Sequence, residues 1–227
     1  MSNTVAPPRQ AGAGWAGKAA SLYAVGGARK YVNAAERHRA LAAMRELPPK
    51  KALFALTLAW TGARVSEVLA LTAASFQVEA GVVAIITLKR RSFIVREVPI
   101  PPDLMAALDQ QFGIAARQRD PATRTLRLWP WHRTTAWRVI KGVMAQAGVA
   151  GRQACPRGLR HAFGVGTLQA TIPITLTSVW LGHASLRTTA IYTTACGPEE
   201  LAFARRFWET SRAVVIIPPT SRRTRAR

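Results

Sequence analysis

The sequence has little cysteine and no long apolar run. Its two cysteines, Cys155 and Cys196, are too few for a disulfide scaffold or a zinc cluster, and we interpret both as reduced thiols in or near the core. The longest apolar stretch, Ala52–Trp60, is well short of the roughly 20 residues that a membrane-spanning helix needs. No basic segment followed by an apolar stretch and a cleavage site stands at the N-terminus. These absences predict a cytoplasmic protein with no membrane partner.

Acidic residues are also scarce. Only 11 aspartates and glutamates stand against 32 lysines and arginines, which gives a formal net charge of +21. A positive field of this strength attracts nucleic acid or an anionic membrane, and the lack of a spanning segment favours nucleic acid. The chain has 227 residues and is 49% hydrophobic, so it can still bury a core. The composition therefore indicates a globular protein that binds nucleic acid.

Composition divides the chain into three parts. Residues 1–30 are rich in glycine, alanine and proline without a sustained apolar period, so we expect a flexible basic leader. Residues 31–211 carry the signals of a folded domain. Residues 212–227 form a basic tail that includes the apolar patch Val214–Ile217. This tail either touches DNA or a neighbouring subunit, or is a disordered positive end.

The folded part has mainly helical patterns. Asn33 and Glu36 form a predicted capping box, and Gly62 is a predicted helix end. Two β-branched stretches, Val82–Thr87 and Phe93–Ile100, predict an antiparallel hairpin with a basic tip. Helices are expected over Ala34–Leu47, Lys51–Trp60, a segment opened by Ser66 and Glu67, Pro101–Phe112, Thr134–Ala147, Pro156–Ala170, Pro173–Trp180, Leu186–Thr193 and Pro198–Ser211, with a polar basic loop after Phe112. The predicted fold class is α+β, mainly α-helical, with one small antiparallel β-sheet.

Two arginines stand in contexts that suit attack on a phosphodiester. Its two non-bridging oxygens repel a nucleophile, so the site needs fixed cations around the transition state. A guanidinium can grip both oxygens at once without changing its protonation. Arg64, in the segment Thr61–Leu69, and Arg160, in a Gly-Leu-Arg-His segment, fit that task.

Three further residues supply the remaining chemistry. Lys89, at the hairpin tip, can give a proton to the leaving 5′ oxygen once burial against DNA lowers its pKa. His183, after Gly182, can hydrogen-bond a phosphate oxygen or the attacking phenol. Tyr192 can form a covalent phosphoenzyme. Singly, each has an ordinary alternative: Arg64 as an ion-pair partner of Glu67, Lys89 as a contact to the DNA backbone, and the others as turn or core residues.

The set, in this order, resembles the tyrosine recombinases, also called the phage integrase family, from about Tyr31 to Trp208. Thr61–Leu69 is similar to the first-arginine motif, and Lys89 falls where the family has its hairpin lysine. Cys155–Gly164 is similar to the segment of the second arginine. The stretch from Trp180 to Tyr192 is similar to the histidine and nucleophile motifs.

This resemblance implies a recombinase catalytic domain. Such enzymes cut one strand through a 3′-phosphotyrosyl bond, release a 5′ hydroxyl and rejoin strands, in integration, excision or resolution of a mobile element or plasmid. They need neither metal nor nucleotide cofactor, and the chain shows no P-loop or Cys/His metal spacing. The implied partner is double-stranded DNA, bound by a homo-oligomer, a tetramer on paired sites. The expected DNA contacts are Arg90, Arg91, Arg138, Lys141 and Arg187.

Two departures from the family pattern keep alternatives open. The second motif usually begins with histidine, and here Arg157 stands there; it would keep a phosphate contact as part of the catalytic set and lose proton shuttling. Residues 1–30 are also too few for the family's separate N-terminal core-binding domain, so we expect none and allow for an accessory DNA-binding factor. The alternatives are a catalytically impaired relative that only binds DNA, and a type IB topoisomerase-like enzyme that nicks and reseals DNA.

Overall fold

The first helices begin and end at local signals. The structure is a computed structural model that describes residues 21–87 and 94–194. Helix α1 (Ala34–Arg45) begins with the predicted capping box, in which Asn33 Oδ1 accepts the Glu36 N–H at 2.8 Å and the Glu36 carboxylate accepts the Asn33 N–H at 2.9 Å. Helix α2 (Pro49–Thr61) ends as predicted at Gly62, whose φ is 60°.

Gly62 is required by packing as well as by backbone conformation. A Cβ atom built there would lie 2.5 Å from the ring of Phe163. The tight turn that Gly62 permits leads directly into α3 (Val65–Leu69), and its N-terminal cap is Arg64. The end of α2 thereby packs against α7 (Pro156–Gln169) and places Arg64 beside the helix that carries Arg160.

The predicted hairpin forms two strands of a small antiparallel sheet. Its strands are β1 (Phe76–Gln77), β2 (Val82–Ile86) and β3 (Val95–Pro99), in the order β1-β2-β3. Ile85 pairs with Arg96, so an arginine points to the same buried face as an isoleucine. Thr87 donates its N–H to the carbonyl of Ile94 at 2.8 Å and closes the described part of the hairpin. The short strand β1 was not predicted.

The segment after Phe112 forms a helix where the sequence suggested a loop. Helix α4 (Pro102–Phe112) ends at Gly113, and the chain restarts at once as α5 (Ile114–Arg119). Two contacts hold the start of α5 in place: Ile114 is fully buried, and Asp109 Oδ1 accepts the Ala115 N–H at 2.7 Å. One buried side chain and a cap from six residues earlier are too weak a pattern to detect in the sequence.

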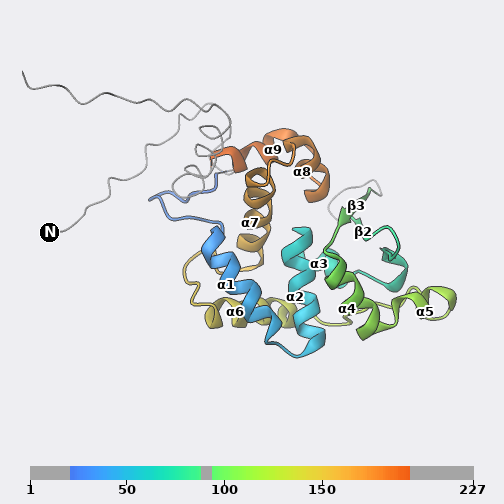
Figure 1. Ribbon diagram of the computed structural model, residues 1–227. Helices are drawn as coiled ribbons and strands as arrows, with labels where there is room; N and C mark the ends of the chain where they lie inside the picture. The colour runs from blue at the N-terminus through green and yellow to red at the C-terminus, as the bar shows by residue number, and fades with distance from the viewer. Residues whose placement is uncertain (1–20, 88–93, 195–227) are drawn as a thin grey trace, which may run out of the picture.

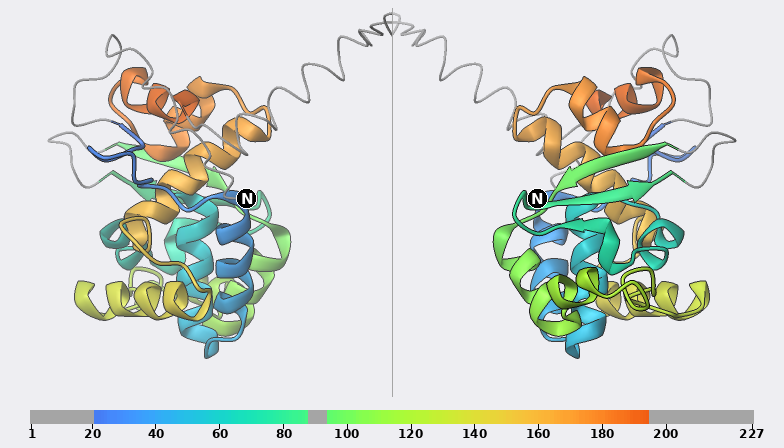
Figure 2. Two further views of the ribbon diagram at one scale, coloured as in Figure 1. Left: turned by 90° about the vertical axis from the view of Figure 1, so that its left-hand side faces the viewer. Right: turned by 90° about the vertical axis from the view of Figure 1, so that its right-hand side faces the viewer.

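The remaining elements complete a mainly helical domain. They are the 3-10 turn η1 (Ala73–Ser75), α6 (Arg133–Gln146), α8 (Ile174–Leu181), α9 (Leu186–Ala190) and the 3-10 turn η2 (Ile191–Thr194). Helix α7 runs through the middle of the molecule, with α8 and α9 at one end and α6 beyond the other (Figure 1). Figure 2 shows β2 and β3 lying along one side of this helical body. The helix expected over Pro198–Ser211 lies outside the described residues.

The buried apolar residues form two clusters. The larger joins α1 to α6 with the sheet, and the smaller surrounds Tyr192. Leu22 is fully buried in the smaller cluster together with Tyr31 and Phe163. The chain therefore packs from Leu22 onward, ahead of the Tyr31 start that the sequence suggested, because Leu22 reaches a cluster made by residues about 140 to 170 positions later. None of the helices within the described residues is long and apolar enough to cross a bilayer.

Candidate active site

Glu67 holds Arg64 in place from a buried position. Arg64 donates from its backbone N–H and from a guanidinium nitrogen to the Glu67 carboxylate, at 2.9 and 2.6 Å. The Glu67 side chain is fully buried, whereas 28% of the Arg64 side chain is exposed. The ion pair between Arg64 and Glu67, which the sequence offered as an alternative role for Arg64, therefore forms, and it leaves part of the guanidinium side chain exposed to solvent. Pairing with Glu67 and availability to a phosphate are compatible.

Arg96 is the second partner of Glu67, and the sequence did not reveal it. It donates to Glu67 Oε2 at 2.6 Å, to Thr87 Oγ1 at 2.9 Å and to the carbonyl of Trp180 at 2.7 Å. Burial raises the pKa of Glu67, but the charge of Arg96 and the hydrogen bonds from both arginines outweigh it and hold the pKa below its usual value. Arg96 thus ties the base of the hairpin to Glu67 and to the end of α8.

Arg160 is fixed by two backbone carbonyls. Its guanidinium donates to Gly62 O and to Leu181 O, both at 2.6 Å, so it bridges the ends of α2 and α8. Burial, and then the charge of Arg64, lower its pKa to about 10, so it is still cationic at neutral pH. A guanidinium has five N–H donors, and these two bonds leave others for a ligand. Arg64 and Arg160 face each other closely enough for their charges to interact.

The turn at Gly182 places His183 in the same site. Gly182 has φ 64°, and a Cβ there would lie 3.0 Å from both Arg96 and Thr87. His183 Nδ1 shares a hydrogen bond of 2.8 Å with Thr189 Oγ1 on α9. Burial, followed by the charges of Arg160 and Arg64, lowers the His183 pKa to about 3, so the ring is neutral at pH 7.

Tyr192 lies in this site and is supplied by the same chain. Its ring stacks on His183, with centroids 6.2 Å apart and planes at 20°. A Cβ at position 164 would lie 2.4 Å from the Tyr192 ring, so Gly164 gives the phenol its room on α7. Burial raises the pKa of Tyr192 to about 12, although Arg160 and Arg64 act in the opposite direction. The phenol is therefore protonated at neutral pH, and only 1% of the residue is exposed.

His161 is a functional candidate that the sequence reasoning missed. Its Nδ1 lies 3.3 Å from the Tyr192 hydroxyl, and the two ring centroids are 5.8 Å apart. The signal was present in the Arg160-His161 pair, but neighbouring helical residues point about 100° apart, so the pair alone does not place both side chains in one site. Tyr192 at η2 fits between these two directions on α7.

The other predicted site residues are spread over the molecule. Lys89, Arg90 and Arg91 lie outside the described residues. Arg157 is exposed in the first turn of α7, and Arg187 is exposed on α9. Helix α6, which carries Arg138 and Lys141, lies away from α8 and α9 (Figure 1). Lys141 donates to the carbonyl of Ala154 at 3.0 Å, so part of its donor capacity is used within the fold.

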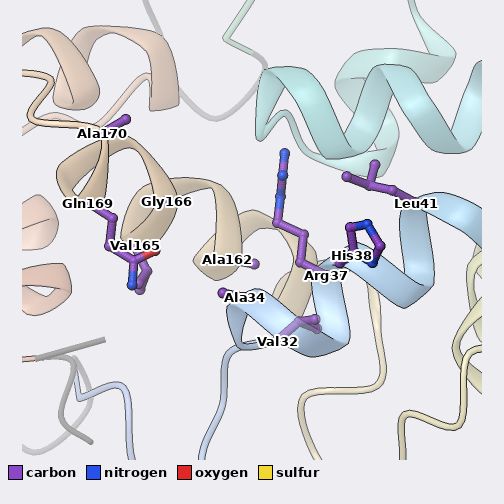
Figure 3. Close-up of a pocket in the computed structure, with 10 residues that line it drawn as sticks. All are labelled: Val32, Ala34, Arg37, His38, Leu41, Ala162, Val165, Gly166, Gln169 and Ala170. Carbon is purple, nitrogen blue, oxygen red and sulfur yellow. The ribbon is translucent and has the colours of Figure 1, made fainter. Parts of the chain in front are cut away.

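A surface hollow lies apart from the residues around Tyr192. A hollow of about 400 Å³ lies between α1 and α7 (Figure 3). Its α7 lining, which includes Ala162 and Val165, is on a different face of the helix from Gly164, so the hollow is separate from Tyr192. Within residues 21–87 and 94–194, no three His, Cys, Asp or Glu side chains gather as metal ligands.

Comparisons with known proteins agree with this arrangement. The profile of the Phage integrase family matches residues 30–196. Tyrosine recombinase XerC of Roseiflexus castenholzii is 33% identical over 151 residues, which is 63% of this chain and 46% of the relative. Tyrosine recombinase XerA of Pyrococcus furiosus is 31% identical over 147 residues, 62% of this chain and 49% of the relative. The chain thus spans about half the length of these curated relatives.

Solved structures show the same fold. The crystal structure of XerA recombinase aligns with a TM-score of 0.63 at 23% identity, covering 81% of this chain and 63% of the other. The catalytic domain of bacteriophage HP1 integrase aligns with a TM-score of 0.55 at 22% identity, covering 80% of this chain and 96% of the other. The predicted α+β class, mainly helical with one small antiparallel sheet, is confirmed. With its sequence motifs and its fold both matched, the chain belongs to the phage integrase family, the tyrosine recombinases.

Proposed function

We propose that the protein is a site-specific recombinase that cuts and rejoins DNA through a 3′-phosphotyrosyl bond on Tyr192. The observation that supports this most is the position of the phenol, within reach of the charges of Arg64 and Arg160 and in contact with two imidazoles. The first and the last of these residues, Arg64 and Tyr192, are 128 positions apart in the sequence. A tyrosine that only filled the core would not need two arginines and two histidines around its hydroxyl group.

Arg64 and Arg160 bind the scissile phosphate in this proposal. Arg64 is partly exposed and held by Glu67, and Arg160 is held by two carbonyls, so neither guanidinium has to be ordered when DNA binds. Preorganised donors stabilise the charge that develops on the phosphate oxygens. His183 adds a donor or acceptor beside them, fixed by Thr189. Lys89 protonates the 5′ oxygen as it leaves, and Arg157 contributes a phosphate contact.

The phenol must move before it reacts. A residue that is 1% exposed cannot touch the phosphate of a duplex, so η2 has to turn outward when DNA binds. Helix α9 and η2 are short, which makes a local rearrangement inexpensive compared with opening the core. Cleavage is therefore expected to be slower than DNA binding and sensitive to changes at Gly164.

The proposed partner is double-stranded DNA, bound by more than one copy of the chain. The net charge of +21 supports DNA binding. Among proteins with this fold, XerH was solved bound to its difH substrate, and lambda integrase was solved as a dimer on a core site. By analogy with them, the chain acts as a homo-oligomer on paired sites, and Arg90, Arg91, Arg138, Lys141 and Arg187 contact the duplex.

Trapping the covalent intermediate tests the proposal. A binding site is first selected from a random duplex pool, and a nicked substrate carrying it is then incubated with the protein so that the cut cannot be resealed. We expect a denaturant-resistant adduct that Tyr192→Phe abolishes and the control Tyr23→Phe retains. Binding without any adduct would instead support the impaired DNA-binding relative. Relaxation of a plasmid by the monomer, without a partner site, would support the topoisomerase alternative.

A further inference from the structure

The attacking phenol has to lose a proton, and few groups around it can accept one. With a pKa of about 12, Tyr192 holds its proton at neutral pH. The guanidinium groups of Arg64, Arg157 and Arg160 have no lone pair to offer. His183 already uses Nδ1 in its hydrogen bond to Thr189. Within the described residues of the site, the ring nitrogen that lies within hydrogen-bonding distance of the phenolic oxygen is Nδ1 of His161, at 3.3 Å.

We propose that His161 is the catalytic base that takes the proton of Tyr192 during strand cleavage. The proposal rests on the proposed function, and it adds a reacting group to that site. The phenolic O–H bond breaks as the oxygen forms a bond to phosphorus, and the proton passes to His161 Nδ1. The bond from phosphorus to the 5′ oxygen breaks, and the general acid protonates that oxygen. On rejoining, the imidazolium returns its proton to the departing phenolate.

The surroundings of His161 keep its ring available as an acceptor. Burial, and then the charges of Arg160, Arg157 and Lys30, lower its pKa to about 4, so the ring is neutral at pH 7. Other groups facing it are Tyr192 on η2 and, in the turn after α8, His183. A phosphodiester bound between the arginines would offset their charges and stabilise the imidazolium. The base would therefore strengthen when its substrate arrives.

The geometry of the contact suits a resting state. A donor–acceptor distance of 3.3 Å is long for an O–H to nitrogen bond, and catalytic contacts are commonly long before substrate binds. His161 lies on α7, next to Arg160, so it shares the rigid element that positions the phosphate. Movement of η2 toward that phosphate would keep the phenol near α7. The simpler role, in which His161 only holds the ring of Tyr192, predicts a different response to a change in phenol acidity.

The test combines His161→Asn with a more acidic phenol. The asparagine amide oxygen can occupy the place of Nδ1 and accept the phenolic hydrogen bond, but it cannot take the proton. We expect adduct formation in single turnover to slow by roughly 10²–10⁴-fold, the usual contribution of a general base. Replacing Tyr192 with a fluorinated tyrosine of lower pKa should restore much of that rate in His161→Asn and change the wild-type rate little. His38→Asn, in the hollow between α1 and α7, is the matched control.

Each outcome distinguishes a catalytic base from a residue that only holds the Tyr192 ring. Rescue by the fluorinated tyrosine supports the base. A His161→Asn rate equal to wild type, or a slow rate that the fluorinated tyrosine leaves unchanged, overturns the proposal. If His161→Asn loses its fold, circular dichroism shows it, and His161→Gly supplemented with imidazole then decides: recovery supports the base and no recovery with a folded protein overturns it. Absence of an adduct in wild type would instead contradict the proposed function itself.

Discussion

Replacing Glu67 with glutamine tests whether one buried carboxylate organises the site. Glutamine has nearly the same shape and can still accept the backbone N–H of Arg64, but it carries no charge. Arg96, which is 4% exposed, would then lose its ion-pair partner. Removing one member of a buried pair costs about 3–5 kcal/mol when the other charge stays buried. Because the glutamine amide keeps some of the hydrogen bonds, we expect the free energy of unfolding to fall by about 3 kcal/mol, the lower end of this range.

This loss is measurable by thermal unfolding. For a chain of this size, 1 kcal/mol corresponds to roughly 2–4 °C, so Glu67→Gln should lower the melting temperature by about 6–12 °C. Glu97→Gln, on the exposed face of β3, is the matched control and should change stability by less than about 0.5 kcal/mol. The pKa of Glu67 is lowered in the folded state, so its stabilisation is present above the unfolded pKa and is lost as the pH falls through the folded value.

Two results would refute this reasoning. If Glu67→Gln melts within about 2 °C of wild type, the carboxylate does not hold the two arginines. If the variant is unstable at pH 7 but the difference from wild type does not shrink in acid, the loss is one of shape and not of charge. Glu67→Gln should also slow adduct formation, because Arg64 is no longer oriented by an anion.

Three more predictions follow from Gly164, Tyr192 and the net charge. Gly164→Ala should destabilise the protein by about 1–3 kcal/mol, because the added methyl group meets the Tyr192 ring. Gly166→Ala has open space on the same helix and should stabilise the protein by about 0.5–1 kcal/mol. Denaturant unfolding measures both changes in the free energy of unfolding. Because the pKa of Tyr192 is raised by burial, wild type should lose about 3 kcal/mol of stability relative to Tyr192→Phe between about pH 10 and 12. If the stability of the two proteins depends on pH in the same way, the phenol is exposed to solvent. DNA affinity should fall by roughly 10³-fold or more between about 50 and 200 mM salt, and unchanged half-saturation would contradict binding through phosphates.

Local signals made much of the fold predictable. Asn33 with Glu36, and Gly62, mark helix ends through contacts within a few residues, so the sequence contains the whole signal. Alternating β-branched residues marked β2 and β3 in the same way. The helix α5 and the burial of Leu22 were missed because α5 packs on η1 and Leu22 packs on α7 and η2, all distant in the sequence.

The residues of the candidate site also differ in how far they could be predicted from local sequence. Arg64, Arg160, His183 and Tyr192 were predicted because their motifs stand in a known order, and the structure brings these four side chains together; their roles stay predictions. Arg96 was missed because its value lies in a hydrogen bond to a carbonyl 84 positions away. His161 is adjacent to a predicted residue, but only the fold shows that Tyr192 lies against it, and its role stays a prediction.

Peptide mapping of the trapped adduct tests the central claim most directly. The denaturant-resistant complex is digested with protease and nuclease, and mass spectrometry locates the remaining nucleotide on the protein. We predict a nucleotide joined through its 3′ phosphate to the peptide that contains Tyr192. A nucleotide on Tyr23 or Tyr31, or one joined through a 5′ phosphate, would contradict the account.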